Sequence, residues 1–183
     1  MNEFVKYILT YQKKLEILKK DKNFSLAESI IENAIIEKKQ VFIFGNGGSA
    51  SIASHFANDL IKNFNCKCFI NPEMSLMTCL SNDFGYKHVM KKTIENYYNQ
   101  GDLVIIISSS GNSKNVIEAT NFCISKKLNL MTLTGMSKNN KIKQLNSNGV
   151  NFWINSNKYN IIENMHQIIL LTIFDVLNEK LKK

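Results

Sequence analysis

Arginine is absent from this 183-residue chain, and proline occurs once, at Pro72. All 23 basic residues are therefore lysines, which give a net charge of +8 but lack the planar fork that reads guanine or grips phosphate through paired hydrogen bonds. The lysines are also dispersed, in pairs such as Lys13-Lys14 and Lys91-Lys92. This composition argues against a nucleic-acid partner and favours solvated helix surfaces.

Long apolar runs are missing as well. The longest ones, residues 103–107 and 168–171, fall far short of the roughly 18 residues that a membrane-spanning helix needs. Residues 1–14 mix charged and polar side chains with apolar ones, which is unlike a secretion signal. We therefore expect a cytoplasmic protein that does not span a membrane.

Cysteine is scarce and irregularly spaced, since only Cys66, Cys68, Cys79 and Cys123 are present. A chain long enough to bury its own core does not need a disulfide framework, so we expect reduced thiols. Cys66 and Cys68 form a C-x-C pair, which is a poor zinc signal without a second pair elsewhere.

The length predicts a single domain, residues 1–183, in which residues 1–38 form an N-terminal helical arm. After a break near residues 21–23, Ser25 is expected to cap a second helix that ends near Lys38. The first helix carries an apolar stripe made of Phe4, Tyr7, Ile8, Tyr11, Leu15 and Leu18. Such a stripe indicates packing against a core or against a partner helix.

Beyond the arm, short β-rich runs alternate with helical segments. Continuous apolar strands, each followed by a loop and a helix, predict a parallel sheet that is covered on both faces. The fold class is therefore α/β, a three-layer αβα sandwich with a central parallel sheet. The clearest strands are residues 41–44, 103–108, 130–134 and 150–154, and the last helix is residues 160–182.

Two strand-to-helix junctions share one design. The first is Gly45-Asn46-Gly47-Gly48-Ser49, and the second is Ser108-Ser109-Ser110-Gly111-Asn112-Ser113. Glycine lets the backbone approach a ligand, serine donates hydrogen bonds, and the first N–H groups of a helix favour an anion. Neither loop has the spacing of a P-loop or of a dinucleotide fingerprint, so ATP and NAD are disfavoured. Two such loops at the carboxyl ends of parallel strands predict a phosphate site rather than two unrelated turns.

The order of four motifs resembles the phosphoheptose isomerase group of the sugar isomerase (SIS) domain family. The motifs are residues 45–50, Ser54-His55-Phe56-Ala57, Asn82-Asp83-Phe84-Gly85, and residues 108–113 followed by Asn115-Val116. The resemblance implies a flavodoxin-like SIS fold and a homotetramer with sites between subunits. It also implies conversion of sedoheptulose 7-phosphate to D-glycero-D-manno-heptose 7-phosphate, a precursor of surface polysaccharides such as lipopolysaccharide or capsule.

The resemblance also implies which residues hold the substrate. The serine loop would bind the phosphate, the glycine loop and one aspartate would line the sugar, and one asparagine would lie beside them. These residues are Ser108, Ser109, Ser110 and Ser113 for the phosphate, and Asn46, Gly47, Gly48, Ser49, Asp83 and Asn82 for the sugar.

The family's isomerases carry a helix with His-Phe-Ala-x-Glu, in which the glutamate is the base. Here that segment reads His55-Phe56-Ala57-Asn58-Asp59. Aspartate keeps the carboxylate but shortens its reach by roughly 1 Å, a misplacement that can cost about a hundredfold in rate. We expect Asp59 to be the base that moves a proton between C1 and C2.

The last helix departs from the family further. The family has Gln-Glu-x-His where this chain has Glu163-Asn164-Met165-His166, and the family's second histidine, an acid and zinc ligand, is Leu171 here. His166, His88 or water must replace that acid. We expect His166, with a structural hydrogen bond as its alternative role. Glu163 is expected to contact substrate, and with His55 and Asp59 it could form a zinc site of two carboxylates and one imidazole.

Two alternatives stay open. Glu163 and Leu171 alter charge and shape near the carbonyl end of the substrate, which would suit an isomerase of another phosphosugar. Some relatives lack the base and acid and act as tetrameric scaffolds for a replication initiator, and the missing histidine favours such a binding role. The retained Asp59 and the intact motif at residues 82–85 favour an enzyme, which is the interpretation we prefer.

Overall fold

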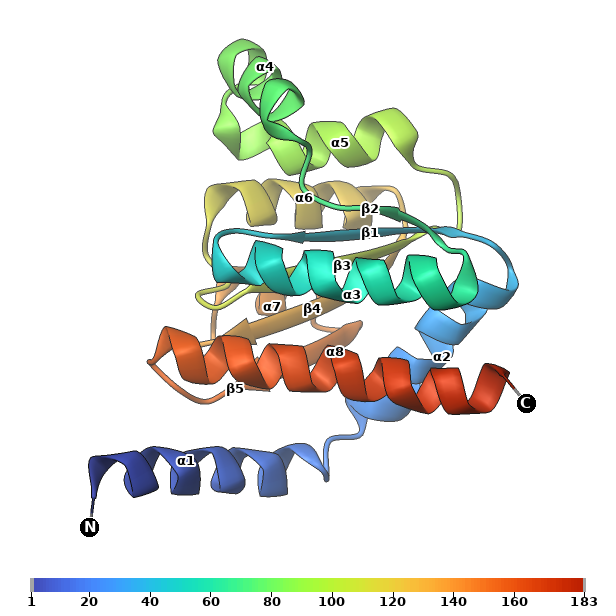
Figure 1. The fold of residues 1–183 in the computed structure, drawn as a ribbon. Coiled ribbons are helices and arrows are strands. Elements are labelled where there is room, and N and C mark those ends of the chain that lie inside the picture. Colours follow the sequence, from blue (N-terminus) through green and yellow to red (C-terminus); the bar gives the residue numbers. More distant parts are fainter. Residues whose placement is uncertain (1, 183) are drawn as a thin grey trace.

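A five-stranded parallel sheet lies between two layers of helices in the computed structural model, which describes residues 2–182 (Figure 1). The strand order is β2-β1-β3-β4-β5, the order of flavodoxin-like folds. The strands are β1 Gln40–Gly45, β2 Lys67–Phe69, β3 Leu103–Ser108, β4 Asn129–Gly135 and β5 Val150–Ile154. The three-layer α/β fold predicted from the sequence is confirmed.

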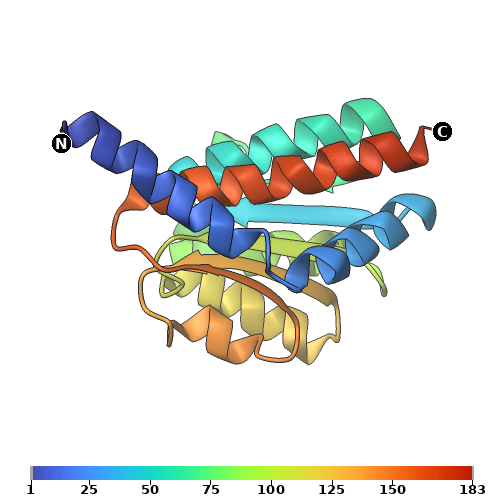
Figure 2. The same ribbon diagram turned by 90° about the horizontal axis from the view of Figure 1, so that it is seen from below.

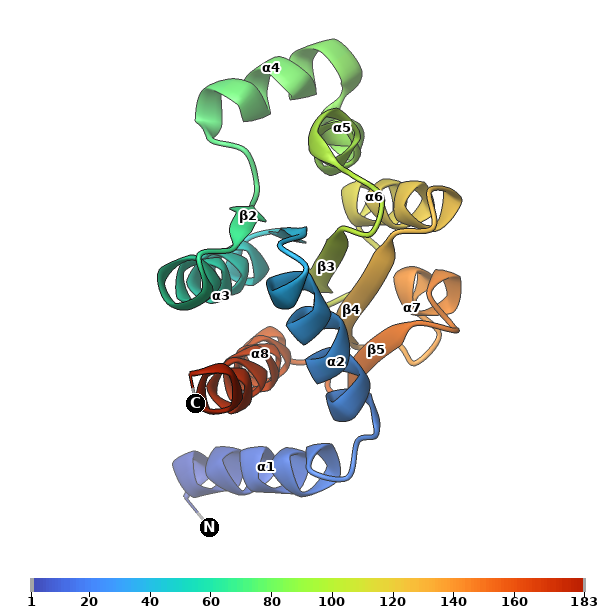
Figure 3. The same ribbon diagram turned by 90° about the vertical axis from the view of Figure 1, so that its right-hand side faces the viewer.

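Helices cover both faces of the sheet, as the view along the strands shows (Figure 3). Helices α2, α3 and α8 pack on one face, and α5, α6 and α7 pack on the other. The helices are α1 Glu3–Leu18, α2 Asn23–Ile36, α3 Gly48–Phe64, α4 Met74–Phe84, α5 Val89–Tyr97, α6 Lys114–Ser125, α7 Lys141–Leu145 and α8 Tyr159–Leu181, with a 3-10 turn η1 at Tyr86–His88. No helix within residues 2–182 combines the length and the apolar content that crossing a membrane requires.

Strand β3 shows why the apolar runs are continuous. Successive side chains of a strand point to opposite faces of the sheet. Ile105 and Ile107 therefore join the core beneath α3 and α8, whereas Val104 and Ile106 join the core beneath α5 and α6. Because helices cover both faces, every residue of β3 is buried, and the strand has no polar alternation.

The structure adds one strand that was not predicted and corrects one predicted helix start. Strand β2 was not predicted, because this short edge strand pairs only with β1 and begins with the exposed Lys67. The expected cap at Ser25 is wrong, because α2 begins two residues earlier. There the Asp21 carboxylate accepts a hydrogen bond from the backbone N–H of Asn23 at 2.9 Å, which starts the turn before Ser25 is reached.

The cysteines are free thiols, as expected. Burial raises the pKa of Cys66 to about 11 and that of Cys68, with a smaller contribution from the nearby Cys66, to about 12. Both thiols therefore stay protonated near neutral pH, which disfavours metal binding because the ligand form is the thiolate.

Of the two N-terminal helices, α1 alone stands apart as an arm, because α2 buries Ala27, Ile31 and Ala34 in the core. Figure 2 shows α1 lying across the N-terminal half of α8. Polar contacts hold it there: the Tyr11 hydroxyl accepts a hydrogen bond from Asn164 Nδ2 at 2.7 Å and donates one to the carbonyl of Asn160 at 3.4 Å.

Truncating an isoleucine of the helix layer should destabilise the fold only where the side chain is buried. Ile94 of α5 is fully buried, whereas Ile124 of α6 is 43% exposed. We expect Ile94→Ala to lower the free energy of unfolding by about 2–5 kcal/mol and Ile124→Ala to lower it by less than about 1 kcal/mol. Urea denaturation of both variants measures the difference, and equal losses would contradict the assigned packing.

Candidate active site

The sheet has one topological switch point, between β1 and β3. From β1 the chain moves outward to β2, and from β3 it moves to β4 on the other side. In open α/β sheets this geometry leaves a crevice at the carboxyl ends of the two strands. Residues 45–49 and 108–113 follow these strands, so the two loops predicted from the sequence flank the same crevice.

A cavity of about 290 Å³ lies between the two loops and the start of α8. All the residues predicted to bind phosphate line it, and so do the residues of the glycine loop predicted to line the sugar, together with Glu163. The residues that line it are Asn46, Gly47, Gly48, Ser49, Ser108, Ser109, Ser110, Ser113, Tyr159 and Glu163. The predicted serine and glycine loops are therefore brought together, which is the central feature of this site.

The glycine loop owes its shape to a left-handed residue and an amide pair. Gly47 has φ +55°, a conformation that residues with a Cβ rarely adopt, and α3 begins at the next residue. Asn46 Nδ2 donates to Asn115 Oδ1 at 3.0 Å, and Asn115 Nδ2 donates back to Asn46 Oδ1 at 2.8 Å. The Tyr86 hydroxyl also donates to Asn46 Oδ1, at 2.8 Å. These bonds tie the loop after β1 to α6 and to η1.

The serine loop is fixed from the side of α7. Gly111 has φ +63°, and a Cβ at this position would collide with the amide group of Asn140. The carbonyl of Gly111 accepts a hydrogen bond from the Ile142 N–H at 3.1 Å, and the Asn112 side chain accepts one from the Lys141 N–H at 2.9 Å. These contacts tie the serine loop to the start of α7.

The hydroxyl groups of the serine loop are free to donate. Ser109 is only 5% exposed, yet its hydroxyl has no hydrogen-bond partner within residues 2–182. Ser108 and Ser110 accept bonds from the N–H groups of Gly111 and Asn112, both at 3.2 Å, which leaves their own protons available. Because a buried polar group without a partner is costly, the Ser109 hydroxyl is the group that a bound oxyanion would satisfy.

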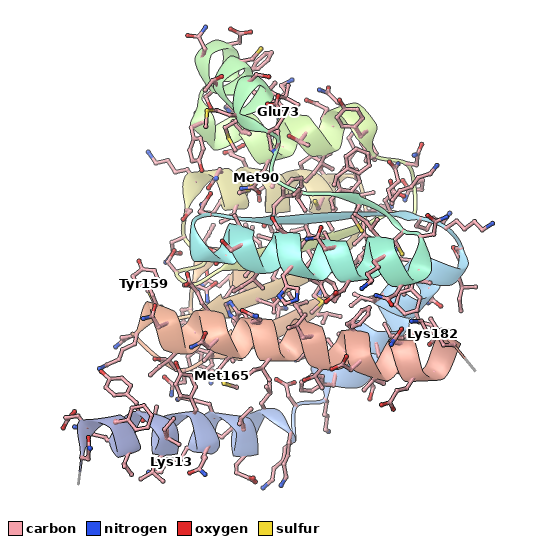
Figure 4. All side chains as sticks on the ribbon, in the orientation of Figure 1. Lys13, Glu73, Met90, Tyr159, Met165 and Lys182 are labelled. Atoms are coloured by element: carbon pink, nitrogen blue, oxygen red, sulfur yellow. The ribbon has the colours of Figure 1, made fainter. Side chains whose placement is uncertain are left out.

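Although the chain carries a net charge of +8, no lysine among residues 2–182 lines this cavity. An anion placed there would instead meet hydroxyl groups and helix N-termini. Helices α3, α6 and α8 all begin at this edge of the sheet, and Figure 4 shows Tyr159 at the N-terminal end of α8. Their dipoles favour negative charge here.

The expected base lies elsewhere on α3. Asp59 follows Gly48 by eleven residues, which corresponds to roughly 16 Å along the helix, so it lies outside the cavity. Its Oδ2 is 3.6 Å from Nε2 of His55, and both side chains are partly exposed. Within residues 2–182, no three His, Cys, Asp or Glu side chains lie close enough together to hold a metal ion. The predicted zinc ligands are therefore split, with His55 beside Asp59 and Glu163 in the cavity.

His166 belongs to the core. It is fully buried, and its Nε2 lies 3.1 Å from the carbonyl oxygen of Thr134. Burial lowers the pKa of the imidazole to about 4, and the hydrogen bond to Thr134 opposes this shift only partly. An imidazole that reaches neither the cavity nor solvent does not fit the acid role expected from the sequence; it fits the alternative, a structural hydrogen bond.

The predicted sugar contacts at the end of α4 also lie outside the cavity. Asn82 and Asp83 are exposed, and Asn82 Nδ2 donates to Asp83 Oδ1 at 3.0 Å. Leu171, in place of the family's second histidine, packs partly buried against the core. Within residues 2–182 of one chain, then, the residues predicted to bind phosphate lie together, whereas those predicted to transfer a proton do not join them.

Residues 3–135 match the family model of the SIS domain. The chain belongs to the SIS domain family. A curated phosphoheptose isomerase from Alteromonas mediterranea is 27% identical over 161 residues, covering 85% of this chain and 81% of that protein. Another, from Cytophaga hutchinsonii, is 34% identical over 126 residues, covering 66% of each. The solved structure of a phosphoheptose isomerase from Neisseria gonorrhoeae has a TM-score of 0.87 and 25% identity, covering 97% of this chain and 95% of that one.

Three residues of this SIS site were not among those predicted to bind substrate. Tyr159 lines the cavity, and Asn115 and Tyr86 hold Asn46 in place. Asn115 belongs to the last of the four motifs that resemble the family, but its partner, 69 residues away, becomes visible only in the fold. No sequence pattern pointed to Tyr159, because α8 was expected to begin after it.

Acidification should weaken the SIS fold through His166. The folded chain holds the pKa near 4, below the ordinary value of 6.5, so between these values the unfolded chain binds a proton that the folded chain does not. The free energy of unfolding should therefore be highest above pH 6.5 and fall by about 3 kcal/mol on acidification to pH 4. Denaturant unfolding across this range should give a flatter profile for His166→Gln. An unchanged profile in that variant would assign the pH dependence to other groups.

Proposed function

We propose that this chain is an aldose–ketose isomerase that converts sedoheptulose 7-phosphate into D-glycero-D-manno-heptose 7-phosphate. The observation that carries this proposal is the serine-lined cavity at the switch point, with the buried and unpartnered hydroxyl of Ser109. Further support comes from relatives, because the two curated proteins and the solved structure described above are named phosphoheptose isomerase.

The cavity suits the phosphate end of such a substrate. Its volume of about 290 Å³ is at the lower limit of small-ligand pockets, which span roughly 300–1,000 Å³. We assign the phosphate to the hydroxyl groups of Ser108, Ser109, Ser110 and Ser113 and to the N-terminus of α6. The carbon chain then extends past the glycine loop and out of the cavity.

Isomerisation requires a base that moves a proton between C1 and C2, and Asp59 is the carboxylate we assign to it. Asp59 does not line the cavity of its own chain and lies roughly 16 Å along α3 from Gly48. We assign the base to Asp59 of a second copy, which also brings a second set of Asn82 and Asp83 side chains to complete the sugar site.

Within residues 2–182, the residues of one chain do not fit a zinc site. His55 and Asp59 supply two of the expected donors, and an ion bound to them would need its remaining ligands from another copy. With His166 in the core, water and His88 remain as sources of the acid. His88 ends η1, and its Nδ1 lies 3.8 Å from Oε2 of Glu118 in α6.

Self-association into a homotetramer is part of the proposal. An apolar groove of about 570 Å³ lies between α1, α2 and α8, and Leu15, Phe24 and Val176 line it. On α1, Phe4 is 70% exposed and Ile17 is 68% exposed. A largely apolar groove and exposed apolar side chains on the same helix are typical of an interface.

We also assign the reaction to the cytoplasm, because the proposed substrate is a charged ester that does not cross bilayers. Its product would enter surface-polysaccharide synthesis there.

The assembly can be tested with a charge placed in the groove. Light scattering should give the mass of four chains for the native protein. Val176→Lys should shift the protein to smaller species, because an ammonium group buried in an apolar interface is costly. Circular dichroism checks that the variant stays folded. A native protein that is monomeric at micromolar concentration would contradict the tetramer.

Turnover of sedoheptulose 7-phosphate, with proton exchange at C1, tests the reaction itself. Asp59→Asn keeps the size of the side chain but removes the base, so turnover should fall by about 10²–10⁴-fold. Asp175→Asn, which removes an exposed carboxylate from α8, is the matched control. Assays with and without added zinc, combined with metal analysis, test whether His55 and Asp59 hold an ion together with ligands from another copy.

Binding of the sugar without turnover or exchange would overturn the proposed reaction. A panel of other ketose phosphates would then separate an isomerase of another phosphosugar from a non-catalytic binding protein.

A further inference from the structure

The carboxylate of Glu163 occupies the phosphate cavity because Gly48 leaves room for it. A Cβ built on Gly48 would lie 2.8 Å from Cδ of Glu163, so the carboxylate rests directly against the backbone of the first turn of α3. Glu163 itself lies in the second turn of α8 and lines the cavity together with the serine loop. A negative charge thus lies in the same cavity as the groups that would bind a negative ligand.

No side chain neutralises this charge. Within residues 2–182, Glu163 makes neither an ion pair with a lysine nor a side-chain hydrogen bond. Apart from Tyr159, the other residues that line the cavity are serine, glycine and asparagine, which are not ionisable. The helix dipoles at this edge compensate the carboxylate in part, and that of α3 lies against it directly.

This arrangement has opposite consequences for two kinds of phosphate. Free inorganic phosphate brings only negative charge, so the carboxylate raises the free energy of its complex with the serine loop. A phosphate ester of a polyol also brings hydroxyl donors, and an ionised carboxylate is purely an acceptor with room for two or more such donors. The ester can therefore recover through hydroxyl bonds what its phosphate loses through repulsion.

We propose that Glu163 is a specificity-determining residue that makes the cavity reject inorganic phosphate and select phosphate esters whose hydroxyl groups reach its carboxylate. The proposal rests on the phosphate role assigned above to the serine loop. It does not depend on which sugar is isomerised, because the selected feature is a hydroxylated carbon chain next to a phosphate. Rejection of free phosphate would keep the site open to esters in solutions rich in that anion.

Equilibrium binding of inorganic phosphate, glycerol 3-phosphate and sedoheptulose 7-phosphate tests this role without any need for turnover. A unit charge at roughly 8 Å, with an effective dielectric constant of about 40, changes a dissociation constant by about fivefold. Glu163→Gln should therefore bind inorganic phosphate about fivefold more tightly, and the gain should shrink at high salt. The preference for either ester over inorganic phosphate should fall by a larger factor, because hydroxyl acceptors are lost as well.

Two further variants sharpen the test. Glu179→Gln removes the same charge from an exposed position near the end of α8, roughly 24 Å along the helix from Glu163, and should change none of the three constants. Gly48→Ala keeps the charge but pushes the carboxylate away from α3, so the preference for the esters should fall here too.

The outcomes separate this inference from the proposed function. If Glu163→Gln binds inorganic phosphate no more tightly than the native chain, or loses no preference for the esters, the inference is wrong even where sedoheptulose 7-phosphate is turned over. If the native chain does not bind sedoheptulose 7-phosphate while Glu163→Gln still gains phosphate affinity and loses its preference for glycerol 3-phosphate, the role of Glu163 stands and the proposed substrate fails.

Discussion

The parallel pairing of β1 with β3 is the constraint on which the rest of the site depends. Its register aligns Gly45 with Ile107, so both strands release their loops at the same level of the sheet. The helices that follow, α3 and α6, must then begin side by side. Serine hydroxyls from one loop and backbone from the other converge on one cavity for this reason alone. The apolar content of β3, which is buried on both faces, stabilises that register.

The cavity that we propose as a phosphate site has no cationic side chain among its lining residues. Within residues 2–182, the lysines that carry the positive charge lie outside it, where solvent screens them. Hydroxyl groups and helix termini act over short distances and in fixed directions. The affinity they provide therefore depends more on the shape of a ligand than on its charge. The carboxylate of Glu163 makes this distinction sharper, since it leaves shape and hydroxyl pattern as the main sources of affinity.

The sequence predicted the parts of the structure that depend on local pattern. The continuous apolar run of β3 and the two loop motifs are contiguous, and their physics is that of one strand end and one helix start. The positions of Glu163 and His166 could not be predicted in the same way. Residues three apart on a helix differ by only about 60° around its axis, yet α8 packs against both the sheet and α3. That rotation places Glu163 in the cavity and His166 in the core, and only the packing of α8 decides which residue goes where.

The hydrogen bonds between the amides of Asn46 and Asn115 couple two positions that lie far apart in the sequence. Each amide uses its donor and its acceptor on the other, and Asn115 is only 3% exposed. A single replacement at either position therefore leaves an unmatched amide in a buried setting, whereas a paired replacement by two apolar residues need not. The residues at positions 46 and 115 are thus expected to be replaced together during evolution or to stay unchanged. The hydroxyl of Tyr86, bound to the same oxygen of Asn46, extends this evolutionary coupling to the segment between α4 and α5.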